Sequence, residues 1–195
     1  DFALAYFPFA DGWIGAHVAG DGQTVLAGPN LPAGTELRLI AAGACAGEVR
    51  LSIPGVNALD DGMLFTVAAG NGDNVTAVGP LPDASGWHIR VADESQDYRS
   101  EERGPFSFLY LPYATPGLVG GWVVEDGSVR RGVGEFAVTH AGKGRYELYI
   151  PGRSDADGIL MLTVAKMNRD GVEDNVLAWQ YEASARSEEH TSEIQ

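Results

Sequence analysis

The chain has 195 residues and a formal net charge of −14, with 13 lysines and arginines against 27 aspartates and glutamates. This balance argues against nucleic acid and anionic membrane surfaces as partners, because both are bound through basic stripes. Cys45 is the single cysteine, so no internal disulfide can form, and no apolar run approaches the roughly 18 residues of a membrane-spanning helix. The 26 glycines and 10 prolines separate short β-branched and aromatic runs, which favours an all-β chain with many turns.

The first predicted strand, residues 2–10, recurs almost position for position as residues 106–114. The two read FALAYFPFA and FSFLYLPYA, and Pro8 matches Pro112. Apolar side chains at adjacent as well as alternate positions predict a strand that is buried on both faces. We therefore predict that residues 1–10 are the last strand of a preceding repeat.

The next matched segments predict a β-hairpin in each half of the chain. An apolar run is followed by Asp-Gly, the dipeptide that best fits a tight hairpin turn because both central residues need positive φ. The segments are residues 12–22 and residues 117–127. The pattern then predicts strands at about 35–42 and 134–141.

A repeated phrase follows, GEVRLSIPG at residues 47–55 and GRYELYIPG at residues 144–152. Apolar side chains at alternate positions predict a strand with one buried face, and Pro-Gly predicts the turn that ends it. Beyond an acidic turn, each half contains two more predicted strands. Those of the first half are residues 63–68 and 75–79, and those of the second are residues 159–165 and 176–182.

Only the first half continues, through strands at residues 87–91 and 106–113. We therefore predict two tandem antiparallel β-sandwich units, Ig-like or jelly-roll-like, of which 11–113 is complete and 114–183 is truncated. Residues 186–195 match nothing in the first half and resemble the translation of a common sequencing adapter, differing at Ile194. We expect 184–195 to be an unstructured tail without a functional role.

Catalytic patterns are not evident. His17, His88 and His140 lie in or beside predicted strands, and no Gly-x-Ser-x-Gly sequence provides a nucleophile. The sequence therefore predicts a protein that is not an enzyme.

Acidic turns recur at matching positions in the two halves. Carboxylate and amide oxygens suit calcium, so one interpretation is a calcium site in each unit. We favour the other, that Asp and Asn are ordinary turn residues that bond to their own backbone, with no cofactor. The candidate ligands are Asp60, Asp61, Asp73, Asn74, Asp155, Asp157, Asp174 and Asn175.

Aromatic side chains offer an alternative function, because their faces stack on sugar rings. The candidates for such a platform are Trp13, Trp87, Tyr98 and Trp122. No spacing gathers three of them on one surface, so a lectin-like module, calcium-assisted or not, is the second hypothesis.

The second half also carries a resemblance to a known kind of repeat. Residues 142–152 read Gly-x-Gly-x-Tyr-x-Leu-x-Ile-Pro-Gly, and an acidic turn and an apolar strand follow; residues 106–113 supply a closing strand. This pattern resembles the tandem β-sandwich repeat of large secreted and cell-surface bacterial proteins, although Val49 stands where the repeat has tyrosine. The resemblance implies an extracellular structural or adhesive module. Its partners would be other repeats of the same chain, and surface glycans or proteins.

Overall fold

The computed structural model describes residues 5–40, 48–70, 74–93, 104–154, 157–165, 177–182 and 191–194. Within these ranges the chain is all-β, with a short 3-10 helix η1 (Phe9–Asp11) and no α-helix. The strands are β1 (Ile14–Val18), β2 (Val25–Ala27), β3 (Glu36–Leu39), β4 (Glu48–Ser52), β5 (Gly62–Ala68), β6 (Asn74–Pro80), β7 (Trp87–Asp93), β8 (Phe106–Pro112), β9 (Gly120–Val123), β10 (Val129–Val133), β11 (Ala137–Gly142), β12 (Arg145–Tyr149), β13 (Val164–Ala165), β14 (Trp179–Glu182) and β15 (Thr191–Ile194).

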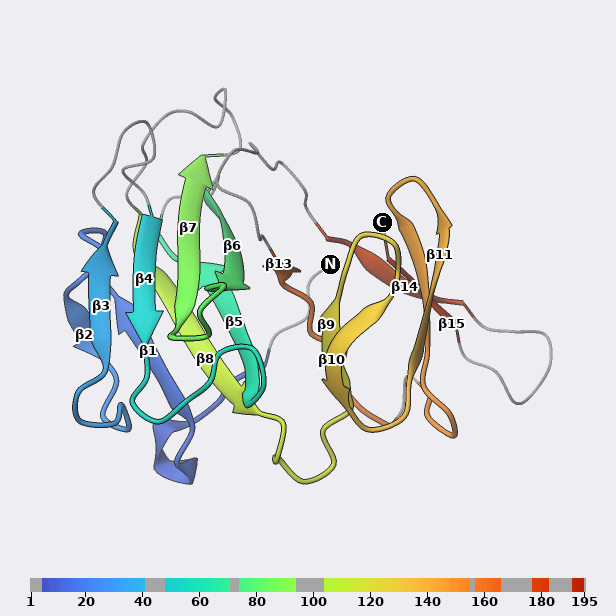
Figure 1. Cartoon of the computed structure of the whole chain (residues 1–195), viewed down its shortest axis with the longest axis horizontal. Helices are drawn as coiled ribbons and strands as arrows, with labels where there is room; N and C mark the ends of the chain where they lie inside the picture. Colours follow the sequence, from blue (N-terminus) through green and yellow to red (C-terminus); the bar gives the residue numbers. More distant parts are fainter. Residues whose placement is uncertain are drawn as a thin grey trace.

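Two sheets enclose the core in the first half of the chain, residues 11–113. One has the order β2-β1-β8-β5, and the other has the order β13-β6-β7-β4-β3. In Figure 1, β4 and β7 lie in front of β8. Alternate residues of β8 point inward, and Phe106, Phe108 and Tyr110 are 0%, 4% and 4% exposed. The facing side chains of the other sheet include Val49, Leu51, Val78, Trp87 and Ile89.

The predicted hairpin after the first strand forms in both halves, with one register. β1 pairs with β2 and β9 pairs with β10, both antiparallel, and each pair has an irregularity at the same place. The matched pairs are His17 with Ala27 and Val18 with Val25 in the first half, and Trp122 with Arg131 and Val123 with Val129 in the second. The turn dipeptides also agree, because Gly22 and Gly127 have φ of 70° and 85°. The hairpin predictions are therefore confirmed.

The two turn aspartates, Asp21 and Asp126, have equivalent surroundings. Each accepts hydrogen bonds from the side chain and backbone of the threonine or serine that follows the turn. These bonds, the side-chain contact first, lower the pKa of both carboxyls below 3.8. The same sequence signal thus gives the same local chemistry in each half.

The repeated phrase forms β4 and β12, each of which pairs antiparallel with the strand that precedes it, β3 and β11 respectively. Leu51 lies opposite Leu37, and Leu148 lies opposite Val138. The Pro-Gly turns that follow also match, since the amide two residues beyond each proline donates to the carbonyl before it at 3.2 Å in both halves. The strand and turn predicted for each copy are confirmed.

Three predictions differ from the structure in the described residues. Residues 5–8 form no strand, because they have no strand partner, and Tyr6 is 82% exposed. Of the strand predicted at 159–165, only β13 forms, and it joins β6 in parallel, so the sheets are mixed and not purely antiparallel. In the predicted tail, residues 191–194 form β15, which pairs with β12 and β14.

We predict that the folded state loses stability at alkaline pH because of the buried phenol of Tyr110. Burial, with a smaller contribution from Asp61, raises the pKa of this phenol from 10.0 to about 12. Between these values the unfolded state loses a proton that the folded state keeps, so stability falls as pH rises from about 10 to about 12, by about 2 kcal/mol. Urea unfolding on either side of this range measures the loss. Tyr110→Phe removes it, and an equal loss in that variant would refute the assignment.

Candidate functional site

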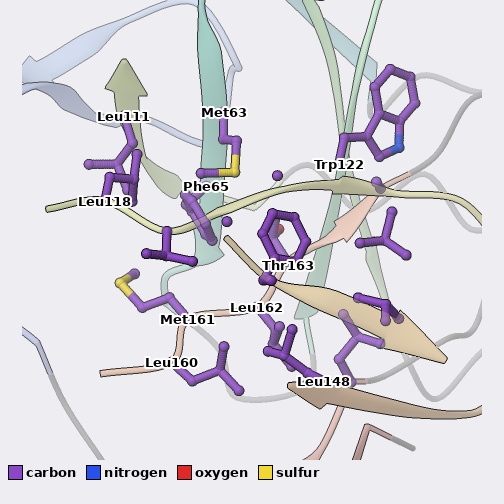
Figure 2. A pocket seen from close by; sticks show the side chains of 18 of the residues that line it. Met63, Phe65, Leu111, Leu118, Trp122, Leu148, Leu160, Met161, Leu162 and Thr163 are labelled. Atoms are coloured by element: carbon purple, nitrogen blue, oxygen red, sulfur yellow. The ribbon is translucent and has the colours of Figure 1, made fainter. Parts of the chain in front are cut away.

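An apolar groove of about 760 Å³ lies where the two halves of the chain meet. Figure 2 shows Trp122 of β9 on one side and residues 160–163 on the other, with side chains of β5 beside them. Aliphatic and aromatic side chains form most of its lining. Those labelled in Figure 2 are Met63, Phe65, Leu111, Leu118, Trp122, Leu148, Leu160, Met161, Leu162 and Thr163.

Two strand segments that border the groove lack, among the described residues, the shared partner strand that their counterparts have in the first half. In the first half, β8 lies between β1 and β5 and pairs with both. The counterpart of β1 is β9, and the counterpart of β5 is residues 158–165. Among the described residues β9 pairs only with β10, and residues 159–163 pair with nothing. Among the described residues, no strand pairs with both of these segments as β8 pairs with β1 and β5 in the first half.

The two halves of the chain also differ in how many apolar side chains they bury. Of the buried apolar side chains in the described part of the chain, only Leu148, 9% exposed, lies beyond residue 113. Its counterpart Leu51 is fully buried at 0%, and Ile159 is 74% exposed. Apolar side chains gathered around an open groove are typical of a binding surface.

The structure does not gather the predicted aromatic platform. Trp87 is 2% exposed and packs against Tyr110 with ring centroids 5.5 Å apart, so it offers no face to a sugar. This corrects the expectation for Trp87, which the strand alternation places inside the core. Trp13 packs edge-on against Phe7 at 5.4 Å, and Tyr98 lies outside the described residues.

Trp122 and Trp87 both line the groove, but of the two only Trp122 is more than marginally exposed. It is half-buried, and the guanidinium of Arg130 lies 4.7 Å from the ring centroid. A cation over an aromatic face stabilises the pair by about 0.5–1 kcal/mol at exposed sites. Arg130 therefore occupies one face of this ring.

Two of the described acidic candidates, Asp61 and Asp157, accept hydrogen bonds within their own loops. Asp61 accepts the backbone N–H of Asn57 at 2.7 Å, and Asp157 accepts that of Ser154 at 2.7 Å, an equivalent role in the two halves. No three described His, Cys, Asp or Glu side chains come close enough together to hold a metal ion. Asn74 begins β6, and the candidates outside the described residues are Asp73, Asp155, Asp174 and Asn175.

Sequence reasoning missed a contact between the two halves. Asp60 Oδ1 lies 2.5 Å from Arg131 Nε, and both side chains are about half exposed. Beside them, burial raises the pKa of the Tyr113 phenol, against a smaller opposing effect of Arg131. No motif marks this pair, because it joins a turn residue, Asp60, to a residue of β10, Arg131, far away in the sequence.

A second missed pair is His17 and Ser107, which lie opposite each other on β1 and β8. His17 Nδ1 lies 3.2 Å from Ser107 Oγ. Neither residue lines the groove. The pair is a cross-strand contact on the half-buried outer face of the sheet.

Comparison with known proteins returns no match: no family model, no curated protein and no solved structure is similar to this chain. What the structure shows is therefore a mostly-β protein with several antiparallel sheets. In the described part of the chain, no helix has the length and apolar character needed to cross a membrane.

Proposed function

We propose that this chain is a non-catalytic structural module, made of tandem β-sandwich repeats, from a long extracellular or cell-surface bacterial protein. The observation that carries the proposal is that equivalent strands pair in both halves. β1 pairs with β2 as β9 pairs with β10, and the repeated phrase, as β4 and β12, pairs in each half with the strand that precedes it. Repeats that stack on their neighbours serve as spacers and extended surfaces.

Contacts between the halves support a spacer of fixed geometry. β13 of the second half extends the sheet of the first half by pairing with β6. The Asp60–Arg131 ion pair joins the two halves at a second point. Two separate attachments limit bending between neighbouring units, which is the property a spacer requires.

Reversing the charge at the junction tests this proposal. Arg131→Asp puts a second carboxylate against Asp60, so we expect X-ray scattering from the full chain to show a larger radius of gyration. The free energy of unfolding should change by about 1 kcal/mol or less, because the pair is exposed.

The charge-swapped double variant Asp60→Arg/Arg131→Asp is the matched control, and it should restore the wild-type scattering profile. Arg130→Asp, on the same strand, controls for the added charge alone. Identical scattering from the wild type and Arg131→Asp would contradict the role of the Asp60–Arg131 pair as a second attachment between the halves.

A further inference from the structure

We propose that the first half of the chain opens under tension by peeling β1 away from β8, and that the Asn30 side chain holds this strand pair closed. The inference rests on the spacer role proposed above, because a spacer carries force through the points where the chain enters and leaves each unit. Three features carry it: where these connections lie, how unequally β1 and β8 are held, and what Asn30 bonds.

The chain enters and leaves the first half at the same end of one strand pair. β1 begins at Ile14 and β8 ends at Pro112, and the antiparallel register places Ile14 opposite Tyr110. In Figure 1 the start of β1 and the end of β8 both lie at the lower end of the two sheets. Directly after β8, the Tyr113 amide donates to the carbonyl of Asp61 at 2.9 Å. Force transmitted along the chain therefore reaches β1 and β8 at one end.

Force applied in this way separates the β1–β8 ladder one pair at a time. The hydrogen bonds of an antiparallel pair run perpendicular to the strands. A sideways pull at the entry end therefore loads the Ile14–Tyr110 pair first and the Val18–Phe106 pair last. A pull along the strands would instead load all of these pairs together. Since few bonds bear the load at any moment, peeling needs less force than sliding.

β8 is held more firmly than β1, so β1 is the strand that separates. β8 pairs with β5 along its whole length, and its side chains Phe106, Phe108 and Tyr110 are buried. β1 contributes only the smaller Ala16 and Val18 to the buried core. Its other neighbour, β2, is short, and the β1–β2 register is irregular. Because buried apolar area sets much of the cost of separation, peeling removes the β1–β2 hairpin and leaves β8 paired with β5.

Asn30 holds the end at which this separation begins. Its side-chain Nδ2 donates to the backbone carbonyls of Phe9 at 2.5 Å and of Trp13 at 3.2 Å. These carbonyls lie on either side of the turn before β1, where Gly12 has a φ of 78° and donates its N–H to the Phe9 carbonyl. Asn30 itself is half-buried in the loop that follows β2. One amide group thus ties the entering chain to that loop, on the path of the load.

Another side-chain contact crosses the same strand pair near its opposite end. His17 Nδ1 lies 3.2 Å from Ser107 Oγ, and beyond them only the Val18–Phe106 pair remains in the ladder. During peeling this contact breaks after the early pairs have opened. It provides a matched control, because both contacts hold β1 but only that of Asn30 lies where opening starts.

Constant-force measurements with two pairs of attachment points test the direction of opening. In a Cys45→Ala background of the full chain, handles on Ala10→Cys and Ala114→Cys pull through the natural connections. Handles on Gln23→Cys and Ala114→Cys pull the end of β1 away from the end of β8, so the force runs along the strands. The three attachment positions are exposed. At the same force, the natural connections should give opening at least about tenfold faster, because forced unfolding follows the unfolding rate and the load falls on few bonds.

Asn30→Ala tests the contact that holds the strand pair closed. With force through the natural connections, this variant should open about tenfold faster than the wild type, because two hydrogen bonds are lost where opening begins. With force along the strands its opening rate should stay close to that of the wild type, since the entering chain then carries no load. Ser107→Ala should open at the wild-type rate through the natural connections.

Equal opening rates in the two pulling directions would overturn the inference. So would an Asn30→Ala chain that opens at the wild-type rate, or one that opens faster by the same factor in both directions, which would indicate a general loss of stability. Equal acceleration by Asn30→Ala and Ser107→Ala would show that opening does not begin where the chain enters. The scattering test of Asp60 and Arg131 measures the junction at rest, so the two proposals fail separately.

Discussion

Leu51→Ala is expected to lower the free energy of unfolding of the first half by about 2–5 kcal/mol. Leu51 is 0% exposed and belongs to the core cluster that lies between the two sheets. Its truncation removes buried methyl groups and leaves a cavity that close-packed neighbours cannot fill. Urea unfolding followed by circular dichroism measures the difference from the wild type.

Leu148→Ala is the matched control, because Leu148 holds the same position in the repeated phrase. It already borders the open groove, so its truncation creates no new closed cavity. We expect a smaller loss, about 1–2 kcal/mol from the transfer of the side chain alone. Equal losses at the two positions would show that the second half has a complete core and would contradict the description of the groove.

Trp87→Ala is expected to cost about 3–5 kcal/mol of stability, the range for removing a large buried aromatic side chain. The ring is 2% exposed and packs on Tyr110, with no surface left for a ligand. Urea unfolding monitored by circular dichroism measures the effect without relying on the fluorescence of the remaining tryptophans.

Trp122→Ala provides the comparison, since both tryptophans were candidates for a sugar platform. Trp122 is half-buried and contacts Arg130 at 4.7 Å, so its loss should cost about 1 kcal/mol. If Trp87→Ala proved as mild as Trp122→Ala, the placement of Trp87 in the core would be wrong.

The candidate site was only partly accessible to sequence reasoning. Repetition identified the closing strand at residues 106–113 and its copy at residues 2–10. The groove itself could not be found, because it depends on how segments far apart in sequence pack together and no motif encodes it. Trp87 was misjudged because a residue after a loop can be the first inward-facing position of a strand, as it is in β7.

Two features determined by the sequence alone are local, and both reappear in the structure. Alternating apolar residues specify a strand face, and Asp-Gly and Pro-Gly specify turns through the φ angles that glycine tolerates. These signals act over a few residues, so they give the same hairpins in both halves. Chain composition likewise indicated the all-β class.

Tertiary structure decided which of these strands find partners. The sequence patterns of residues 159–165 and 2–10 are as typical of strands as those of β5 and β8. In the described parts of these segments, however, only β13 pairs with another strand. A strand forms ladder hydrogen bonds only where the edge of another strand lies beside it. Hydrogen bonds between strands join segments that are far apart in sequence. A local sequence pattern therefore cannot predict which strand, if any, will pair with a given segment. Burial, the groove and the Asp60–Arg131 contact all follow from that long-range pairing.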